Sequence, residues 1–320
     1  MSAVEPSPHA RRRIARLVDQ ALRESEALGV LPTPLEALRA AAALEIVEAP
    51  GLRPEVLGAI WFEERTVFVA GAQSVSRRRF TEAHEIAHAL CGWHYAALRE
   101  DTASSLFGPA RDAIEAEANA GAAMLIFQGE AFRERAAGLP CTLQTVRTLA
   151  EAFGASLHAT LHHYVQTSPL PVAMLTVGRF RRSDGTLPVW RRVVSPGFPS
   201  SAAGVPGTAA GGVLPGSPLD AVIEAARTSG DAGAVLGEAP GALQAEAHYN
   251  RHAFLVLVRA AQSRVGMTPR GSRSLQRRDV QPVQPAAARP CHEPGPAPLD
   301  RGGVRAQDGV DRRAARASRR

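Results

Sequence analysis

The sequence predicts an α+β fold: a mainly helical region with one small sheet, a helix-turn-helix-like pair, a small α+β region and a disordered tail. Apolar residues recur at helical spacing through the first half and are interrupted by one strand-like hairpin. Runs typical of strands return only after the break Ser168-Pro169-Leu170-Pro171. The composition changes to Arg, Pro, Gly and Ser after Arg259. We therefore divide the chain into 1–138, 139–168, 169–260 and 261–320.

The first helices are indicated by spacing and by capping residues. Residues 9–29 place Ile14, Val18 and Leu22 on one face, as an amphipathic helix does. Thr33 is a good N-cap with Pro34 at the first helical position, which predicts a second helix in LPTPLEALRAAAALEIVEAP. The stretch LGAIWFEERTVFVAG then predicts a hairpin over 57–70, because two apolar runs flank a charged turn.

A further helix carries the segment RRRFTEAHEIAHAL. Thr81 is the expected N-cap, with Glu82 in the first turn. The alanine-rich run AIEAEANAGAAMLIF predicts the next helix. After the break, VAMLTV, LPVWRRVV and FLVLV are typical of strands, and SPLDAVIEAARTS is typical of a helix.

Residues 142–164 have the pattern of a helix-turn-helix. Gly154 fits the turn, and Ser156 fits the cap of the second helix. That second helix, LHATLHHYV, carries three histidines and no arginine, so it offers little for phosphate or guanine contacts. We expect two packing helices here, and we do not expect direct DNA binding.

The positive charge belongs to the tail. The basic side chains are all arginines, and residues 259–320 hold 14 of them against five Asp and Glu. The remaining chain is slightly acidic, and the tail's composition predicts disorder. Cys91, Cys141 and Cys291 are too scattered for a disulfide framework. Neither a membrane span nor a secretory signal is evident, so we expect a cytoplasmic protein without membrane association.

His84-Glu85-Ile86-Ala87-His88 is an H-E-x-x-H motif. Positions four apart share one helix face, so both imidazoles can bind one metal ion. Glu85 lies one position further round, where it can act as a general base on a water molecule that zinc acidifies. The recurring arrangement in zinc peptidases is of this kind.

A catalytic zinc site needs a third protein ligand, and the sequence offers several. His94 completes the histidine spacing of metzincins, but Cys91 stands where their turn needs glycine. Glu115 and Asn119 are four apart, which echoes the E-x-x-x-D of thermolysin-like enzymes, where the second residue orients a histidine. Glu117 points about 160° away from Glu115 on a helix of 3.6-residue period, so it is a weaker candidate.

RRRFTEAHEIAHAL followed by IEAEANAGAAMLI resembles the ImmA/IrrE family of zinc metallopeptidases. The resemblance extends over about residues 9–258 to the IrrE branch known from the Deinococcus radiation response, with a GAF-like α+β region after the helix pair. It implies zinc ligands His84, His88 and Glu115, with Glu85 as the base; Mn²⁺ is an alternative metal. The sequence departs from the family at Gly121, where Phe is frequent, and at LIFQGEAF, where many members have L-x-M-P.

The resemblance further implies a protease that cuts a helix-turn-helix repressor and so releases a stress response to DNA damage. An extended substrate would add to the sheet edge of the 57–70 hairpin. Tyr95, His94 and His162 are candidates for stabilising the oxyanion, although a structural role is expected for each. The alternative is a DNA-binding regulator whose metal is only structural, and Glu85 discriminates between the two because a structural site has no use for it.

Overall fold

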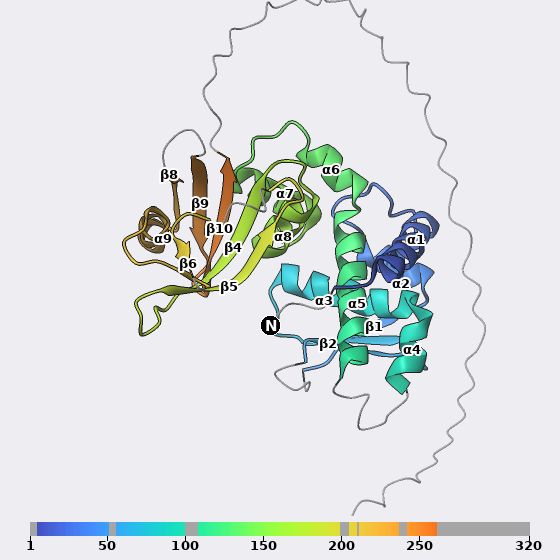
Figure 1. Cartoon of the computed structure of the whole chain (residues 1–320). Coiled ribbons are helices and arrows are strands. Elements are labelled where there is room, and N and C mark those ends of the chain that lie inside the picture. Colours follow the sequence, from blue (N-terminus) through green and yellow to red (C-terminus); the bar gives the residue numbers. More distant parts are fainter. Residues whose placement is uncertain are drawn as a thin grey trace, which may run out of the picture. The chain divides into compact units, whose positions relative to one another are not determined.

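The computed structural model describes residues 5–50, 56–99, 108–198, 205–209, 211–236 and 242–260. A helical region with a three-stranded sheet is followed by a seven-stranded antiparallel sheet (Figure 1), so the predicted α+β class is confirmed. The tail predicted to be disordered, 261–320, lies outside the described residues. In the parts that are described, no helix has both the length and the apolar character needed to cross a membrane.

The first helix, α1 (Pro8–Glu24), is capped by the Ser7 hydroxyl and buries one apolar face. The second, α2 (Leu35–Ala41), corrects the expected cap, because Pro34 occupies the cap position and Thr33 does not cap. The Thr33 hydroxyl instead donates to the Leu125 carbonyl at 2.8 Å. The amide of Gln128, within the segment that departs from the family pattern, donates to this same hydroxyl at 2.9 Å.

Helix α2 is shorter than predicted, and a strand takes its second half. Ala43 has a positive φ of 48°, which ends the helix, and β1 (Glu45–Glu48) follows. The predicted hairpin is confirmed as β2 (Gly58–Trp61) and β3 (Thr66–Val69). The sheet order is β1-β3-β2, with β1 parallel and β2 antiparallel to β3, so β2 is an edge strand.

Two helices carry the candidate metal ligands. The first, α3 (Val75–Leu90), has Ser74 at its cap position, so the expectation that Thr81 caps it was wrong. Thr81 lies inside the helix, and its buried hydroxyl donates to the Gln73 amide oxygen at 3.0 Å. After α4 (Gly92–Arg99), the second such helix is α5 (Pro109–Phe127), which packs along α3 and α1.

The predicted helix-turn-helix-like pair is present and is part of the core. After α6 (Glu130–Ala136) come α7 (Leu143–Phe153) and α8 (Leu157–Thr167). Gly154 ends α7 with a φ of 61°, and the Ser156 hydroxyl accepts from the Ala159 amide, as predicted. Helix α8 packs against the large sheet, and each of its residues is buried or half-buried.

The large sheet has the strand order β6-β7-β5-β4-β10-β9-β8. Helix α9 (Pro218–Ser229) packs on β8 and β9 on one face of the sheet, while α7 and α8 pack on the opposite face (Figure 1). The strands are β4 (Val172–Gly178), β5 (Leu187–Val194), β6 (Thr208–Ala209), β7 (Gly212–Val213), β8 (Asp231–Leu236), β9 (Leu243–Tyr249) and β10 (Ala253–Ala260).

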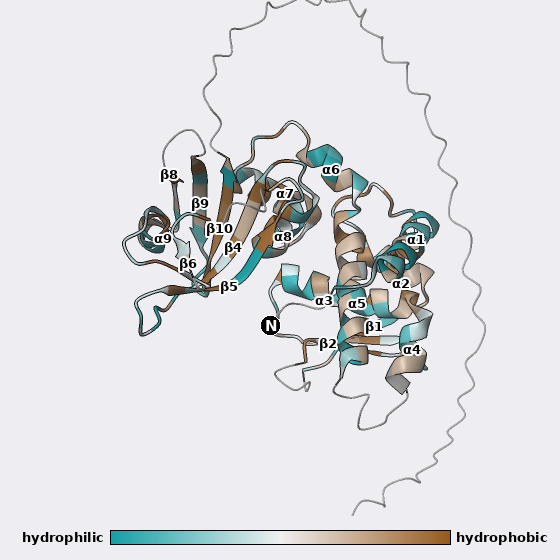
Figure 2. Cartoon of the chain, in the orientation of Figure 1, coloured by the Kyte–Doolittle hydropathy of each residue, from teal (hydrophilic) through white to brown (hydrophobic). Residues whose placement is uncertain are grey.

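Both faces of the central strand β4 are covered, and β4 is hydrophobic along its length (Figure 2). Val172 and Met174 join the core that includes α1, α3 and α5, whereas Ala173 and Leu175 join the core beneath α9. This alternation with period two places one hydrophobic cluster on each side of the sheet. Strands β8 and β9 were not predicted, because DAGAVL and LQAEAHY contain few β-branched residues.

The burial of His163 on α8 should make the stability of the fold depend on pH. Its ring stacks on the ring of Phe127, with the ring centroids 4.3 Å apart, and meets the ring of Phe132 edge-on, with the centroids 4.7 Å apart. Its Nε2 is buried, and no described residue offers it a hydrogen bond. Burial lowers the pKa of His163 to about 4. The folded protein therefore keeps the ring neutral, while the unfolded chain takes up a proton below its ordinary pKa of about 6.5.

We expect His163→Phe to reduce the loss of stability on acidification. Because the folded pKa is depressed, the stability linked to His163 is complete above about pH 6.5 and is lost as pH falls towards 4. Between pH 7.5 and 5 the free energy of unfolding, measured with urea, should fall by roughly 2 kcal/mol less in the variant. An identical fall in both proteins would contradict this account.

Candidate metal centre

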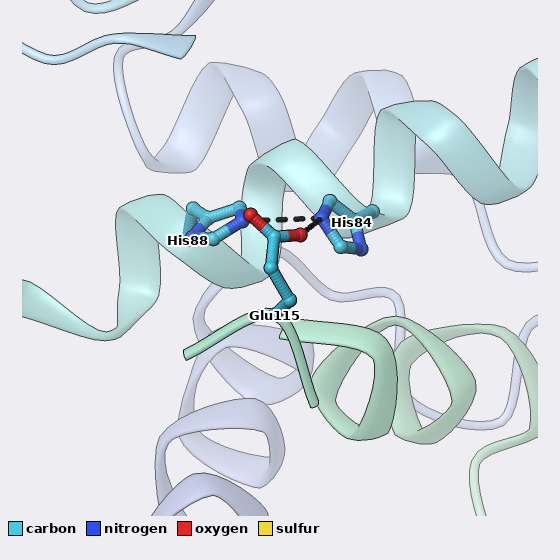
Figure 3. Close-up of side chains that lie close together, drawn as sticks. All are labelled: His84, His88 and Glu115. Atoms are coloured by element: carbon cyan, nitrogen blue, oxygen red, sulfur yellow. Dashed lines mark hydrogen bonds and ion pairs between the residues drawn. The ribbon is translucent and has the colours of Figure 1, made fainter. Parts of the chain in front are cut away.

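Three metal-binding side chains converge from two helices. His84 and His88 lie one turn apart on α3, and their Nε2 atoms are 3.1 Å from each other. Glu115 reaches them from α5, with its Oε2 atom 3.2 Å from His84 Nε2 (Figure 3). The three donor atoms lie within 4.8 Å of one another, and among the described residues they form a group that could hold a metal ion, called the metal-binding group below.

The group fits a zinc ion in chemistry and in spacing. Two imidazoles and one carboxylate are the protein ligands of a known class of catalytic zinc site. Ligand atoms about 2.0 to 2.1 Å from a tetrahedral ion stand roughly 3.4 Å apart, which is close to the two separations of 3.1 and 3.2 Å. The residues that the sequence nominated as ligands are thus brought together by the fold.

Small residues let the two helices approach closely. Ala118 and Ala122 on α5 are fully buried. A Cβ atom added to Gly121 would lie 2.7 Å from the Cβ atom of Ala87, the residue before His88. The departure from the family pattern at Gly121 therefore has a physical consequence: α5 can lie against α3 at this level.

Asn119 supports His84 from the same helix as Glu115. Its Oδ1 atom is 3.1 Å from His84 Nδ1. With Nε2 turned to the metal-binding group, His84 donates its Nδ1–H to this oxygen, which fixes the tautomer. The predicted four-residue spacing of Glu115 and Asn119 thus places both side chains at one imidazole.

His94 does not join the metal-binding group. Its Nδ1 atom is 3.0 Å from His88 Nδ1, and its Nε2 atom is 3.1 Å from Glu117 Oε2. Glu117 is not a member of the metal-binding group and is paired with His94. The sequence nominated both residues as rival ligands, and His94 also as an oxyanion-stabilising residue. It did not predict this contact, because the contact depends on how α4 turns back after Cys91.

Glu85 is buried between α3 and the edge strand β2. It is 5% exposed, and burial raises the pKa of its carboxyl to about 7. A Cβ atom added to Gly58, the first residue of β2, would lie 2.9 Å from Glu85 Oε1 and 2.4 Å from the Thr81 methyl. The missing side chain of Gly58 therefore makes the room that Glu85 occupies.

The pKa values of the three candidate ligands are shifted in different directions. Burial pulls the pKa of His84 down, but its hydrogen bond to Glu115 and the charges of Glu85 and Glu115 outweigh this and raise it. Burial, followed by the charges of His84 and His94, lowers the pKa of His88 to about 3. The hydrogen bond from His84 lowers the pKa of Glu115. The site therefore favours a carboxylate at Glu115 and a neutral ring at His88, which are the forms that bind metals.

Two residues considered for oxyanion stabilisation lie elsewhere or are already engaged. His162 is on α8 with its Nε2 atom 3.4 Å from Arg191. The Tyr95 hydroxyl donates to Glu63 at 3.1 Å, and its ring packs against Phe62.

The fold and the site define a domain of the zinc-metallopeptidase-like class: an H-E-x-x-H helix, a carboxylate from a second helix and an adjoining edge strand. Residues 46–164 match the family model of the IrrE N-terminal-like domain, a peptidase family. The family resemblance inferred from the sequence is therefore confirmed for this part of the chain.

Solved structures also resemble the chain, and one of them is similar over a larger part of it. A Mycobacterium tuberculosis transcriptional regulator superposes with a TM-score of 0.52 at 15% identity, over 80% of this chain and 76% of that one. At this identity the likeness concerns the fold alone. No curated protein sequence matches the chain significantly.

Replacement of Glu115 tests the three-residue group. We expect Glu115→Gln to weaken zinc binding by more than the roughly 10- to 100-fold that loss of an outer-shell partner costs, because the amide cannot supply the negative charge. Zinc affinity would be measured by competition with a chromophoric chelator. Asp112→Asn, an exposed carboxylate on the first turn of α5, is the control and should bind zinc like the native protein.

Gly121→Ala tests the helix contact. The added methyl meets Ala87, so we expect overpacking to lower the free energy of unfolding by about 1–3 kcal/mol and to weaken zinc binding by moving Glu115. Gly92→Ala has open space at its Cβ position and serves as the control. Native stability and zinc affinity in Gly121→Ala would show that the contact does not set the ligand spacing.

Proposed function

We propose that the protein is a site-specific, cytoplasmic zinc metalloprotease that cleaves a helix-turn-helix repressor and so releases a stress response to DNA damage. The observation that carries the catalytic part is the position of Glu85. It adjoins His84 on α3 and is held against the edge strand β2.

The residues divide the chemistry between them. His84, His88 and Glu115 would hold the zinc ion, which supplies the Lewis acidity that polarises a scissile carbonyl. Glu85 takes the proton of the attacking water and delivers it to the leaving amine. A pKa near 7 suits a group that must both accept and return a proton near neutral pH.

The edge strand supports binding of an extended peptide. Among the described residues β2 pairs with β3 alone, so its outer side can accept a further strand by backbone hydrogen bonds. A hollow of about 450 Å³ borders β2 and is lined largely by apolar residues, among them Ile60, Trp61 and Phe68. Trp61 is half exposed beside it. This surface suits a substrate with a large apolar side chain near the cut.

The choice of a repressor as substrate rests on the family. The IrrE N-terminal-like match covers the whole of the candidate site, from β2 to α5, and ends at residue 164 within α8. The stress response, the cytoplasmic location and the substrate class are proposed on that kinship.

The alternative is a DNA-binding regulator with a structural metal; the Mycobacterium tuberculosis protein of similar fold is described as a transcriptional regulator. The environment of α8 argues against DNA reading by this helix. His158 contacts Thr176 of β4, His162 contacts Arg191 of β5, and His163 stacks on Phe127. A structural metal site would also leave the buried carboxyl of Glu85 without a purpose.

The role of Glu85 is tested by Glu85→Gln. The variant keeps the shape of the side chain but cannot accept the proton, so we expect zinc affinity to stay native while cleavage slows by about 10²–10⁴-fold. Glu64→Gln, an exposed carboxylate in the β2–β3 hairpin, is the control. Undiminished proteolysis by Glu85→Gln would refute the mechanism.

The same variant identifies the substrate. Immobilised Glu85→Gln is exposed to native lysate, bound proteins are identified by mass spectrometry, and each is then treated with the native enzyme with and without chelator. Cleavage of a helix-turn-helix repressor only when metal is present supports the proposal. Retention of DNA alone, with no protein cut, supports the regulator.

A further inference from the structure

We propose that His94, Glu117 and Trp93 are positioning residues that hold His88 in its metal-binding orientation. This inference deepens the proposed function, because it rests on the same metal centre. It assigns a role to the histidine whose spacing suggested a third ligand.

The three residues form a continuous hydrogen-bonded chain behind His88. His88 Nδ1 is 3.0 Å from His94 Nδ1, and His94 Nε2 is 3.1 Å from Glu117 Oε2. The indole N–H of Trp93 donates to the same Glu117 oxygen at 2.8 Å. The chain therefore runs from the far side of His88 to a carboxylate that receives two donors.

One set of proton positions satisfies every member. When His88 Nε2 is free to bind metal, His88 Nδ1–H donates to His94 Nδ1, and His94 Nε2–H donates to Glu117. Both histidines are then neutral, with opposite ends acting as donor and acceptor. The carboxylate of Glu117 fixes the tautomer of His94, and His94 in turn fixes the tautomer of His88.

Burial makes this chain a constraint on the ring of His88. His94 is 0% exposed, and the Glu117 side chain is only 16% exposed. A buried imidazole needs partners for both nitrogens, and His94 has them in His88 and Glu117. Both nitrogens of His94 are thus engaged, so none is left to complete a metzincin-type metal site.

Four helices fix the chain in place. His88 comes from α3, Trp93 and His94 from α4, and Glu117 from α5. The guanidinium of Arg13 on α1 lies 3.6 Å from the centre of the Trp93 ring and covers its face. Glu115 and Glu117, two positions apart on α5, therefore serve opposite ends of His88: one on the metal side and one behind it.

The two metal-side histidines have unequal support. Among the described residues, Nδ1 of His84 is supported by the amide of Asn119, an exposed residue, at 3.1 Å. His88 has a buried chain that ends in a carboxylate. We therefore expect the geometry of His88 to depend on residues that never contact the metal.

The experiment compares His94→Leu, His94→Asn and Glu117→Gln with the native full-length chain. His94→Leu removes the acceptor behind His88, whereas the amide oxygen of His94→Asn can stand where His94 Nδ1 lies. Cys91→Ala is the matched control, because Cys91 is equally buried at the start of the same turn. Its backbone carbonyl accepts from the His94 amide at 2.7 Å, a contact that the substitution keeps, and its side chain takes no part in the hydrogen bonds among the described residues. The readouts are zinc affinity by chelator competition and the visible absorption spectrum of the Co²⁺-loaded protein.

We expect His94→Leu to weaken zinc binding by about 10- to 100-fold and to change the cobalt spectrum. Glu117→Gln should weaken binding less, because hydrogen bonds remain, and His94→Asn should recover most of the affinity lost in His94→Leu. Cys91→Ala should match the native protein in both readouts.

Native zinc affinity and an unchanged cobalt spectrum in His94→Leu would overturn the proposal. Equal losses in His94→Leu, His94→Asn and Cys91→Ala would also overturn it, since they would indicate general loosening of the fold. These readouts need no substrate. If the zinc affinities of the native protein and its variants follow the predicted order but the native protein cuts no repressor, the proposed function is contradicted and the positioning role remains supported.

Discussion

The close packing of α5 against α3 is the constraint on which the site depends. Gly121 lies where a side chain would strike Ala87, and this contact sets how near the two helices come. At that separation Glu115 reaches His84, and Glu117 reaches His94. A packing interaction between two small residues thus determines the position of the ligand and of its support.

Burial then gives each polar group around the centre a specific state. Glu85 lies between α3 and β2, where the loss of water raises its pKa. His94 is equally removed from solvent, and its two hydrogen bonds are the condition for that burial. Low exposure to solvent therefore makes Glu85 a proton-accepting group on one side of the centre and fixes the imidazole of His94 on the other. Rigid support of this kind is what a metal site needs in order to keep its geometry.

The sequence predicted what depends on local spacing. Four-residue spacings placed His84 with His88 and Glu115 with Asn119, and turn chemistry placed Gly154. Long-range contacts were not predictable in this way. Thr33 fails as a cap because its hydroxyl bonds a carbonyl 92 residues away.

Two further differences have the same origin. β1 is a strand because it pairs with β3, although its residues continue a helical stretch of sequence. His94 is not the third metal ligand that its spacing suggested, because α4 places it behind His88. In both cases a partner distant in the sequence, or the path of the chain, decides the outcome.

The most direct measurement of the central claim is zinc-edge anomalous diffraction from crystals of the zinc-loaded native protein. We expect one anomalous peak at bonding distance from His84 Nε2, His88 Nε2 and a Glu115 carboxylate oxygen, with His94 hydrogen-bonded behind His88. A peak bonded to His94, or zinc bound away from α3 and α5, would contradict it.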